Sequence, residues 1–336
     1  MGTNEVNRKR MQSGTEVTPG TGVAATRIVY TSFNSNFTKP LQDLPNFSGT
    51  YDDGGSPVYR RQPPPTFSGS ALLTFDDIVL WAQVGIDNVA QGTGDSGTPE
   101  AFEWEFEPDV EDDNLASWTL EHGEPGNAYE SDQFFLNSWT LRINPDSDGG
   151  WMFDWEALAR TWVTTSYTAA LPARRPEVIR APGTLVWVDD NTIGSTAATG
   201  KIIDFSLACG INRHLKPFME TDGSYPANRH GRGRLTFDAT MTVEFDNDTE
   251  FAKFRAGNPV ERKVRIRKTG TTIHDAVTKK AELDIYGFYN AIDVNGDREG
   301  NMVATFGINC RRNLSAGHAV KLTVINDIED APGDEP

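Results

Sequence analysis

The sequence predicts a mainly β protein made of two tandem β-barrel or β-sandwich modules, each with one short α-helix. Apolar and polar residues alternate along many short segments, which is the pattern of half-buried strands. Only two segments carry the start and stop signals of helices. The 31 Gly and 19 Pro residues in 336 favour many turns over long helices.

The clearest predicted strand is 102–108, where three aromatic residues alternate with three glutamates. One face of this strand should therefore be buried and the other solvated. Similar alternation or a short apolar run predicts further strands at 116–122, 137–143, 150–159, 183–190, 202–211, 234–245, 264–268, 281–290, 301–309 and 319–326.

Two apolar-periodic segments predict the helices. One runs from the cap Asp76 to Gly85, and the other runs from Asn247 or Asp248 to Gly257. Each begins at an acidic or amide cap and ends at a glycine, as helices in folded proteins commonly do. We expect one such helix in each half of the chain.

The helices reveal an internal repeat. Each half reads as a strand, Phe-Asp, a short helix, Gly, two strands, a polar turn and a long strand. The repeat matches 102–108 with 261–268, and the hairpin turn at 146–149 with the one at 295–297. Two domains of one fold follow from this repeat.

Domain boundaries are predicted from Gly, Pro and Ser-rich stretches. They divide the chain into an extended arm at 1–24, a first β module at 25–172 with a long loop at 34–68, a linker at 173–182, a second β module at 183–326, and an acidic tail at 327–336.

The composition excludes several classes of protein. No apolar run reaches the roughly 18 residues of a membrane-spanning helix, and we expect neither a membrane span nor a secretion signal. Cys209 and Cys310 are too few for a disulfide scaffold. The formal net charge is −17, so the chain should repel nucleic acid instead of binding it without sequence preference.

The motifs that suggest catalysis or ligand binding are weak. Residues 94–97 look like a serine-protease nucleophile segment, and 293–299 begin like a calcium loop but lack its Gly and Glu positions. Glu103, Glu105 and Glu107 could be glycosidase carboxylates, although their equal spacing favours a solvated face. We expect no enzymatic activity, no cofactor and no metal site.

Charge is distributed unevenly along the chain. Residues 100–132 carry twelve acids and no Lys or Arg, whereas two basic clusters lie in the second half. A nucleic-acid stripe, a solvated face and a contact with the acidic half of a neighbouring copy are all possible readings, and the asymmetry favours the third. The predicted inter-subunit charges are Glu103, Glu105, Glu107, Asp112, Asp113, Arg229, Arg232, Arg234, Arg265 and Arg267.

The order of these segments resembles the major tail tube protein of long-tailed, siphovirus-like bacteriophages, in its two-module version. The similar segments are 14–30, 68–86, 101–123, 134–160 and 183–257, and the resemblance covers about 14–326. The chain departs from the family pattern at the long loop with its Pro run.

The resemblance implies a structural virion protein that self-assembles into stacked rings with six modules each. Three chains with two modules, or six chains using one module each, would close a ring. The hollow tube would pass genomic DNA into the host without binding it specifically. Its partners would be copies of itself and the tape-measure, tail-tip and tail-terminator proteins, and assembly would take place in the bacterial cytoplasm.

The resemblance also implies that the polar faces of the long hairpins line the tube. The residues expected at the lumen are Asn137, Arg142, Asn144, Asn290, Asp293 and Asn301. A negative lumen would keep DNA from adhering during transit. The alternative to a tube subunit is a capsid decoration protein or a host-receptor binding β protein.

Overall fold

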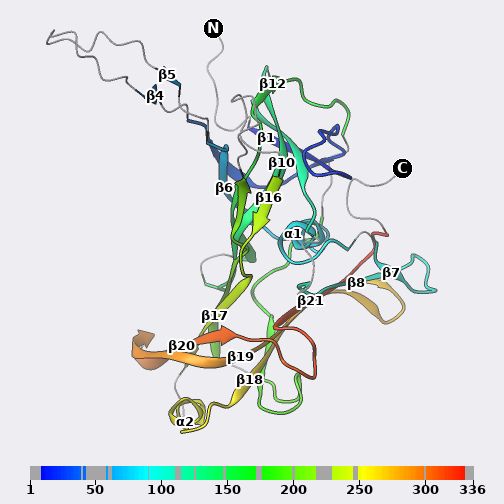
Figure 1. Cartoon of the computed structure of the whole chain (residues 1–336). Helices are drawn as coiled ribbons and strands as arrows, with labels where there is room; N and C mark the ends of the chain where they lie inside the picture. The colour runs from blue at the N-terminus through cyan, green and yellow to red at the C-terminus, as the bar shows by residue number, and fades with distance from the viewer. Residues whose placement is uncertain are drawn as a thin grey trace, which may run out of the picture.

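A computed structural model shows that the chain is mainly β and forms one large antiparallel sheet (Figure 1). The structure describes residues 9–38, 41–42, 58–59, 63–89, 91–109, 115–124, 126–146, 149–171, 176–198, 201–216, 229–244, 249–298 and 300–329.

Ten strands lie side by side in a central antiparallel ladder. In spatial order they are β3 (Ser32–Asn36), β6 (Thr66–Leu72), β11 (Trp151–Leu158), β10 (Asn127–Ile143), β14 (Ile202–Gly210), β17 (Thr236–Glu244), β20 (Asn301–Cys310), β19 (Val277–Arg298), β18 (Glu261–His274) and β13 (Leu185–Asp189).

Two branches extend from the ladder. The first half of β10 pairs with β9 (Trp118–Glu124) and β12 (Val163–Thr165), and β9 continues to β1 (Arg10–Thr15) and β2 (Arg27–Ile28). The first half of β19 pairs with β21 (Val320–Asn326), which continues to β8 (Phe102–Phe106) and β7 (Thr93–Gly94). Two separate strand pairs are β4 (Leu41–Gln42) with β5 (Val58–Tyr59), and β15 (Arg213–Lys216) with β16 (Arg229–Arg232).

The same order of strand pairing occurs twice in the chain. The first half has β3–β6–β11–β10–β9, and the second has β14–β17–β20–β19–β18. Helix α1 (Asp77–Gly85) follows β6, and helix α2 (Thr249–Arg255) follows β17. In both halves one long strand pairs with the preceding strand along its first part and with the following strand along its last part, so β10 and β19 are structural equivalents.

The structure corrects the predicted match between 102–108 and 261–268. The counterpart of β18 is β9, because each forms a hairpin with the long strand that follows it. Strand β8 instead pairs with β21, which lies more than 200 residues later in the chain. The sequence pattern missed this because alternation identifies a strand but not its partner.

The two halves share one sheet and one core. Pairing of β10 with β14 and of β8 with β21 connects them, and buried apolar side chains from both form one continuous cluster. The predicted linker is described at 176–182, where Ile179 is fully buried and exchanges backbone hydrogen bonds with Leu73 and Trp151. This part of the linker belongs to the packed fold.

The two helices occupy their predicted places, but one cap differs. All nine residues of α1 are buried, and the Thr74 hydroxyl accepts a hydrogen bond from the Asp77 backbone N–H at 2.9 Å. The Asp76 side chain makes no capping bond. Helix α2 ends at Arg255, and its predicted caps Asn247 and Asp248 lie outside the described residues.

Three predicted irregular segments contain strands. The expected arm includes β1, where Met11, Gln12 and Ser13 are buried against β9 and β2. The ends of the expected 34–68 loop pair in register as β3 and β6. The expected turn at 295–297 lies within β19, and the chain reverses at Gly300, whose φ of 92° suits glycine.

Candidate assembly surfaces

One side of the ladder, here called the polar face, carries hydroxyl, amide and carboxylate groups. A row of residues directly opposite one another crosses seven strands, and it consists of Ser32, Ser70, Asp154, Thr140, Ala208, Asp238 and Asn309. Residues of the opposite parity, such as Trp139 and Leu207, are buried in the core. The alternation of strand side chains thus places a polar surface over an apolar one.

Carboxylates dominate the charge of the polar face. From β3 to β20, together with the last part of β19, register places six acids there, namely Asp154, Glu156, Asp204, Asp238, Glu244 and Asp293. In this part of the face the one base among the described side chains is Arg142, whose Nε lies 2.5 Å from Asp154 Oδ2. Farther along the same side, β18 carries Lys263, Arg265 and Arg267 opposite the acidic strand β19. The polar face therefore has an excess of negative charge, which repels phosphate groups.

Several residues predicted for the lumen lie on or beside this face. Arg142, Asp293 and Asn301 have the parity of the polar face. The Asn301 side-chain amide donates a hydrogen bond to Glu244 on β17. Asn144 lies just beyond the end of β10, where its side-chain oxygen accepts a hydrogen bond from the backbone N–H of Asp146 at 2.9 Å.

Asn137 and Asn290 occupy equivalent irregularities in the two repeats. The register of β10 shifts between Leu136 and Ser138, and that of β19 shifts between Tyr289 and Ala291. Each asparagine is the extra residue of a bulge on a long strand, and bulges bend strands and increase their twist. These two positions therefore set the curvature of the polar face.

The predicted basic pair on β18 has acidic partners within the same chain. Arg265 NH2 lies 2.6 Å from Asp284 Oδ2 and 3.6 Å from Glu282 Oε1, and Arg267 forms an ion pair with Glu282. The hydrogen bonds that Arg265 donates to Asp284 raise the pKa of Arg265. Cross-strand pairing between β18 and β19 thus gives both arginines acidic partners within the chain, whereas the charge pattern of the sequence predicted acidic partners on another copy.

The glutamates of β8 are placed as the alternation predicted. Lys321 Nζ on β21 lies 2.7 Å from Glu105 Oε1 and 3.1 Å from Glu107 Oε1. Glu103 is exposed at the end of the same strand. The three carboxylates form a solvated face, and two of them pair with a lysine of the neighbouring strand.

The other predicted charge contacts are described only in part. Arg232 NH2 donates a hydrogen bond to the Asp109 carbonyl oxygen at 3.3 Å, so this base meets the acidic segment of its own chain. Arg234 is exposed. The side chain of Arg229 and all of Asp112 and Asp113 lie outside the described residues.

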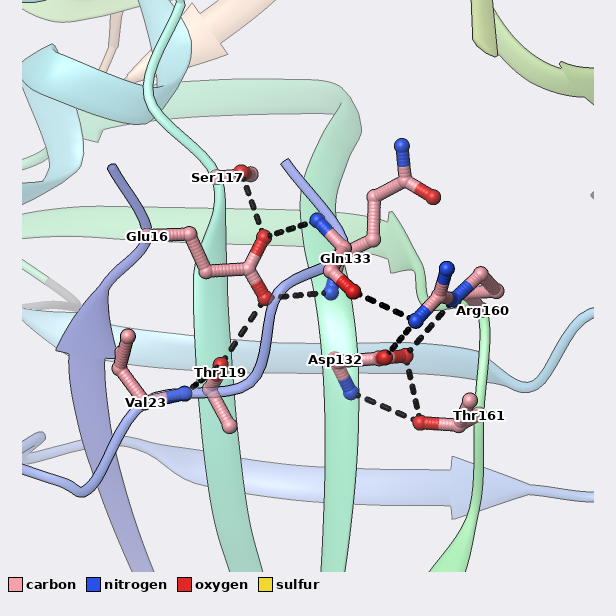
Figure 2. A network of polar contacts seen from close by, with 9 residues as sticks. Glu16, Val23, Ser117, Thr119, Asp132, Gln133, Arg160 and Thr161 are labelled. Carbon is pink, nitrogen blue, oxygen red and sulfur yellow. Dashed lines mark hydrogen bonds and ion pairs between the residues drawn. The ribbon is translucent and has the colours of Figure 1, made fainter. Parts of the chain in front are cut away.

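A buried polar network fixes the N-terminal segment to the first repeat, as Figure 2 shows. The Glu16 carboxylate accepts hydrogen bonds from Ser117 Oγ at 2.8 Å, Thr119 Oγ1 at 2.9 Å, and the backbone N–H groups of Gly20 and Gln133, both at 2.7 Å. Glu16 is 6% exposed. Four donors compensate the burial of its charge.

A second carboxylate extends this network. Asp132 accepts hydrogen bonds from Thr161 and from the Arg160 guanidinium, and Arg160 also donates to the Gly20 carbonyl oxygen at 2.6 Å (Figure 2). The segment that begins at Glu16 is thereby tied to β10 and to the residues after β11. No sequence pattern points to these residues, because their partners lie up to 140 positions away.

The segments that resemble catalytic and calcium-binding motifs form structural contacts and part of a strand in this fold. His274 Nε2 lies 2.8 Å from Asp95 Oδ2, which connects the loop after β7 to the β18–β19 hairpin. No hydrogen bond joins Ser96 to this ring among the described residues. Residues 293–298 belong to β19, where a calcium loop has no room. The described part of the chain contains no group of three metal-ligating side chains.

The sequence was matched against protein families and curated proteins without a hit. No helix in the described ranges is long and apolar enough to cross a membrane.

Proposed function

We propose that the chain is the structural subunit of a hollow bacteriophage tail tube. Copies would form rings that stack into the tube of the virion, with the polar face toward the lumen. Genomic DNA would pass through without specific binding. The tape-measure, tail-tip and tail-terminator proteins would be its further partners.

The observation that carries this proposal is the acidic polar face repeated over two equivalent hairpins. A passage for DNA needs a surface that offers hydration and few unpaired cations, because arginine and lysine contacts with phosphates retain nucleic acid. The six carboxylates and the hydroxyl rows of the polar face meet this requirement. Continuation of the sheet between neighbours would also satisfy its edge strands.

The twofold repetition suggests how a ring closes. Each chain has two similar long-strand hairpins, β10–β11 and β19–β20, and they lie in the same ladder. Three chains would then supply six hairpins in a pseudo-six-fold ring. Six chains, each using one hairpin at the lumen, are the other way to build it.

Negative-stain electron microscopy of the purified chain, with in-line mass measurement of its soluble fraction, tests the proposal. Hollow stacked rings are expected, and a ring mass of three or six chains distinguishes the two arrangements. A monomer that never assembles, even when phage tail-tip complexes are added to initiate growth, would refute the tube function. A capsid pull-down would then test the decoration alternative.

A further inference from the structure

A basic cleft lies where the ends of several strands meet. Its volume is about 520 Å³, and Arg232, Arg234, Arg311 and Arg312 line it together with His318. This local concentration of bases contrasts with the formal net charge of −17 of the whole chain. The cleft also contains two acids, Asp109 and Asp238, and Oδ1 of Asp238 is already engaged by the side-chain amide of Asn309 at 2.8 Å.

His318 points independently to a ligand. Its side chain is buried, with the residue 8% exposed, and neither ring nitrogen has a hydrogen-bond partner among the described residues. The nearest acidic group is Glu107, whose Oε2 lies 3.4 Å from Nδ1, and Tyr286 packs edge-on against the ring. A buried ring nitrogen without a partner costs free energy unless a ligand or water completes it.

We infer that this cleft binds the acidic segment 330–335 of a second copy of the chain. The segment contains Asp330, Asp334 and Glu335 and no base, so its carboxylates match the guanidinium groups. Arginine forks bind carboxylates bidentately, and His318 offers an N–H donor beside them.

The direction of β21 explains why a second copy supplies the segment. The cleft lies beside His318, just before β21, whereas the acidic segment leaves from the opposite end of that strand. Strand β21 alone covers about 20 Å from Val320 to Asn326, and His318 lies before its start. Six residues beyond Glu329 reach about 20 Å at most. Glu329 itself is held by Gln91, whose Nε2 lies 2.9 Å from Glu329 Oε1.

Such a contact joins copies head to tail. The cleft lies at the start of β21 and the acidic segment follows the end of that strand in the sequence, so each copy can bind one neighbour and be bound by another. Heterologous contacts of this kind produce rings or open stacks. The inference deepens the proposed function by naming one contact between tube subunits, and its test below does not require tubes to form.

Binding of a dye-labelled peptide of residues 327–336 to the full chain, followed by fluorescence anisotropy, tests the cleft. We expect saturable binding that weakens at least about tenfold between 50 and 500 mM salt, because exposed ion pairs are screened. The double variant Arg234→Glu/Arg311→Glu should lose at least about tenfold in affinity. The matched double variant Arg180→Glu/Lys216→Glu reverses two exposed bases outside the cleft and should bind normally.

Several results would overturn the inference. They are absence of saturable binding, equal binding by the cleft variant, or equal binding of a peptide in which Asp330, Asp334 and Glu335 are replaced by Asn, Asn and Gln. Binding of inorganic phosphate without the peptide would assign the cleft to a small anion instead. Peptide binding by a chain that builds no tube would support this contact while refuting the tube function.

Assembly supplies the second readout. If the natural chain forms tubes, Arg234→Glu/Arg311→Glu should form fewer and shorter ones, and combining it with Asp330→Lys/Asp334→Lys should restore them. Tubes of normal length from the cleft variant alone would refute the contact and leave the proposed function standing. A native mass spectrum and a thermal melt confirm that each variant is folded.

Discussion

His122 lies in the aromatic centre of the first repeat. Its ring is 4.9 Å from that of Trp162 and 5.0 Å from that of Phe67, and Nε2 is 3.1 Å from Ser131 Oγ. Burial lowers the pKa of His122 from its ordinary 6.5 to about 4. Between these values the unfolded chain binds a proton that the folded chain excludes, so this group makes the fold less stable as the pH falls.

We therefore expect His122 to cost about 2–3 kcal/mol of unfolding free energy between pH 7 and pH 4.5. His122→Phe keeps the ring volume and should reduce this loss by that amount in urea unfolding at the two pH values. His214→Gln changes an exposed histidine and should leave the loss as it is. An unchanged loss in His122→Phe would contradict the assignment.

Glu16 is a buried carboxylate that accepts hydrogen bonds from four donors. Replacing it with Ala leaves the Ser117 and Thr119 hydroxyls and two backbone N–H groups without their acceptor. We expect a loss of about 3 kcal/mol, and a smaller loss for Glu16→Gln, which retains one acceptor oxygen. Urea midpoints measure both, and Glu103→Gln on the exposed face should stay within about 0.5 kcal/mol.

At the scale of elements, the close approach of β3 and β11 to β6 requires a glycine at one position of β6. A Cβ on Gly69 of β6 would overlap the Ser32 carbonyl oxygen and lie 2.6 Å from the Trp155 ring. Gly69→Ala should destabilise the β3–β6–β11 edge by about 2–3 kcal/mol. Gly257→Ala, with no heavy atom within 4 Å of its Cβ, is the matched control and should be nearly neutral. Faster hydrogen exchange confined to β3 and β6 would confirm the site of damage.

Sequence periodicity predicted those elements whose burial alternates. Strand β8 shows the expected pattern, with Phe102, Trp104 and Phe106 buried and the intervening glutamates outward. Strand β1 and the first half of β10 were missed, because they bury polar residues such as Gln12 and Asp132. Asp132 accepts hydrogen bonds from Arg160 and Thr161, and Gln12 Nε2 donates one to the Thr168 carbonyl oxygen, and no local pattern encodes such distant partners.

The register of strand pairing determines which charged side chains have partners within the chain and which are left exposed to other molecules. Basic and acidic clusters are visible in the sequence, but Arg265 meets Asp284 only because β18 and β19 pair in one particular register. The same holds for Lys321 and Glu105 across β21 and β8. Arg234 and Arg311 remain exposed in the basic cleft, which was assembled from segments that are nearly 80 residues apart.

At the scale of the whole molecule, acidic and basic side chains are concentrated on different parts of the surface. The polar face carries an excess of carboxylates, and the basic cleft lies at the start of β21, whose end precedes the acidic segment in the sequence. If copies stack through this contact, their acidic faces align along the stack. The sum of the aligned charges, more than any single residue, would then govern the passage of DNA.

Reversing acids on the polar face should therefore turn a passive passage into a retentive one. In tubes of Asp204→Lys/Asp293→Lys, the new lysines would face phosphates, and release of counterions would favour binding. We expect at least about tenfold more nuclease-protected DNA at low salt than in natural tubes, with release near 0.5 M salt. Glu103→Lys/Asp275→Lys makes the same charge change on exposed residues elsewhere and should protect no DNA. Equal protection by both variants, or protection by the second alone, would mean that another face lines the tube.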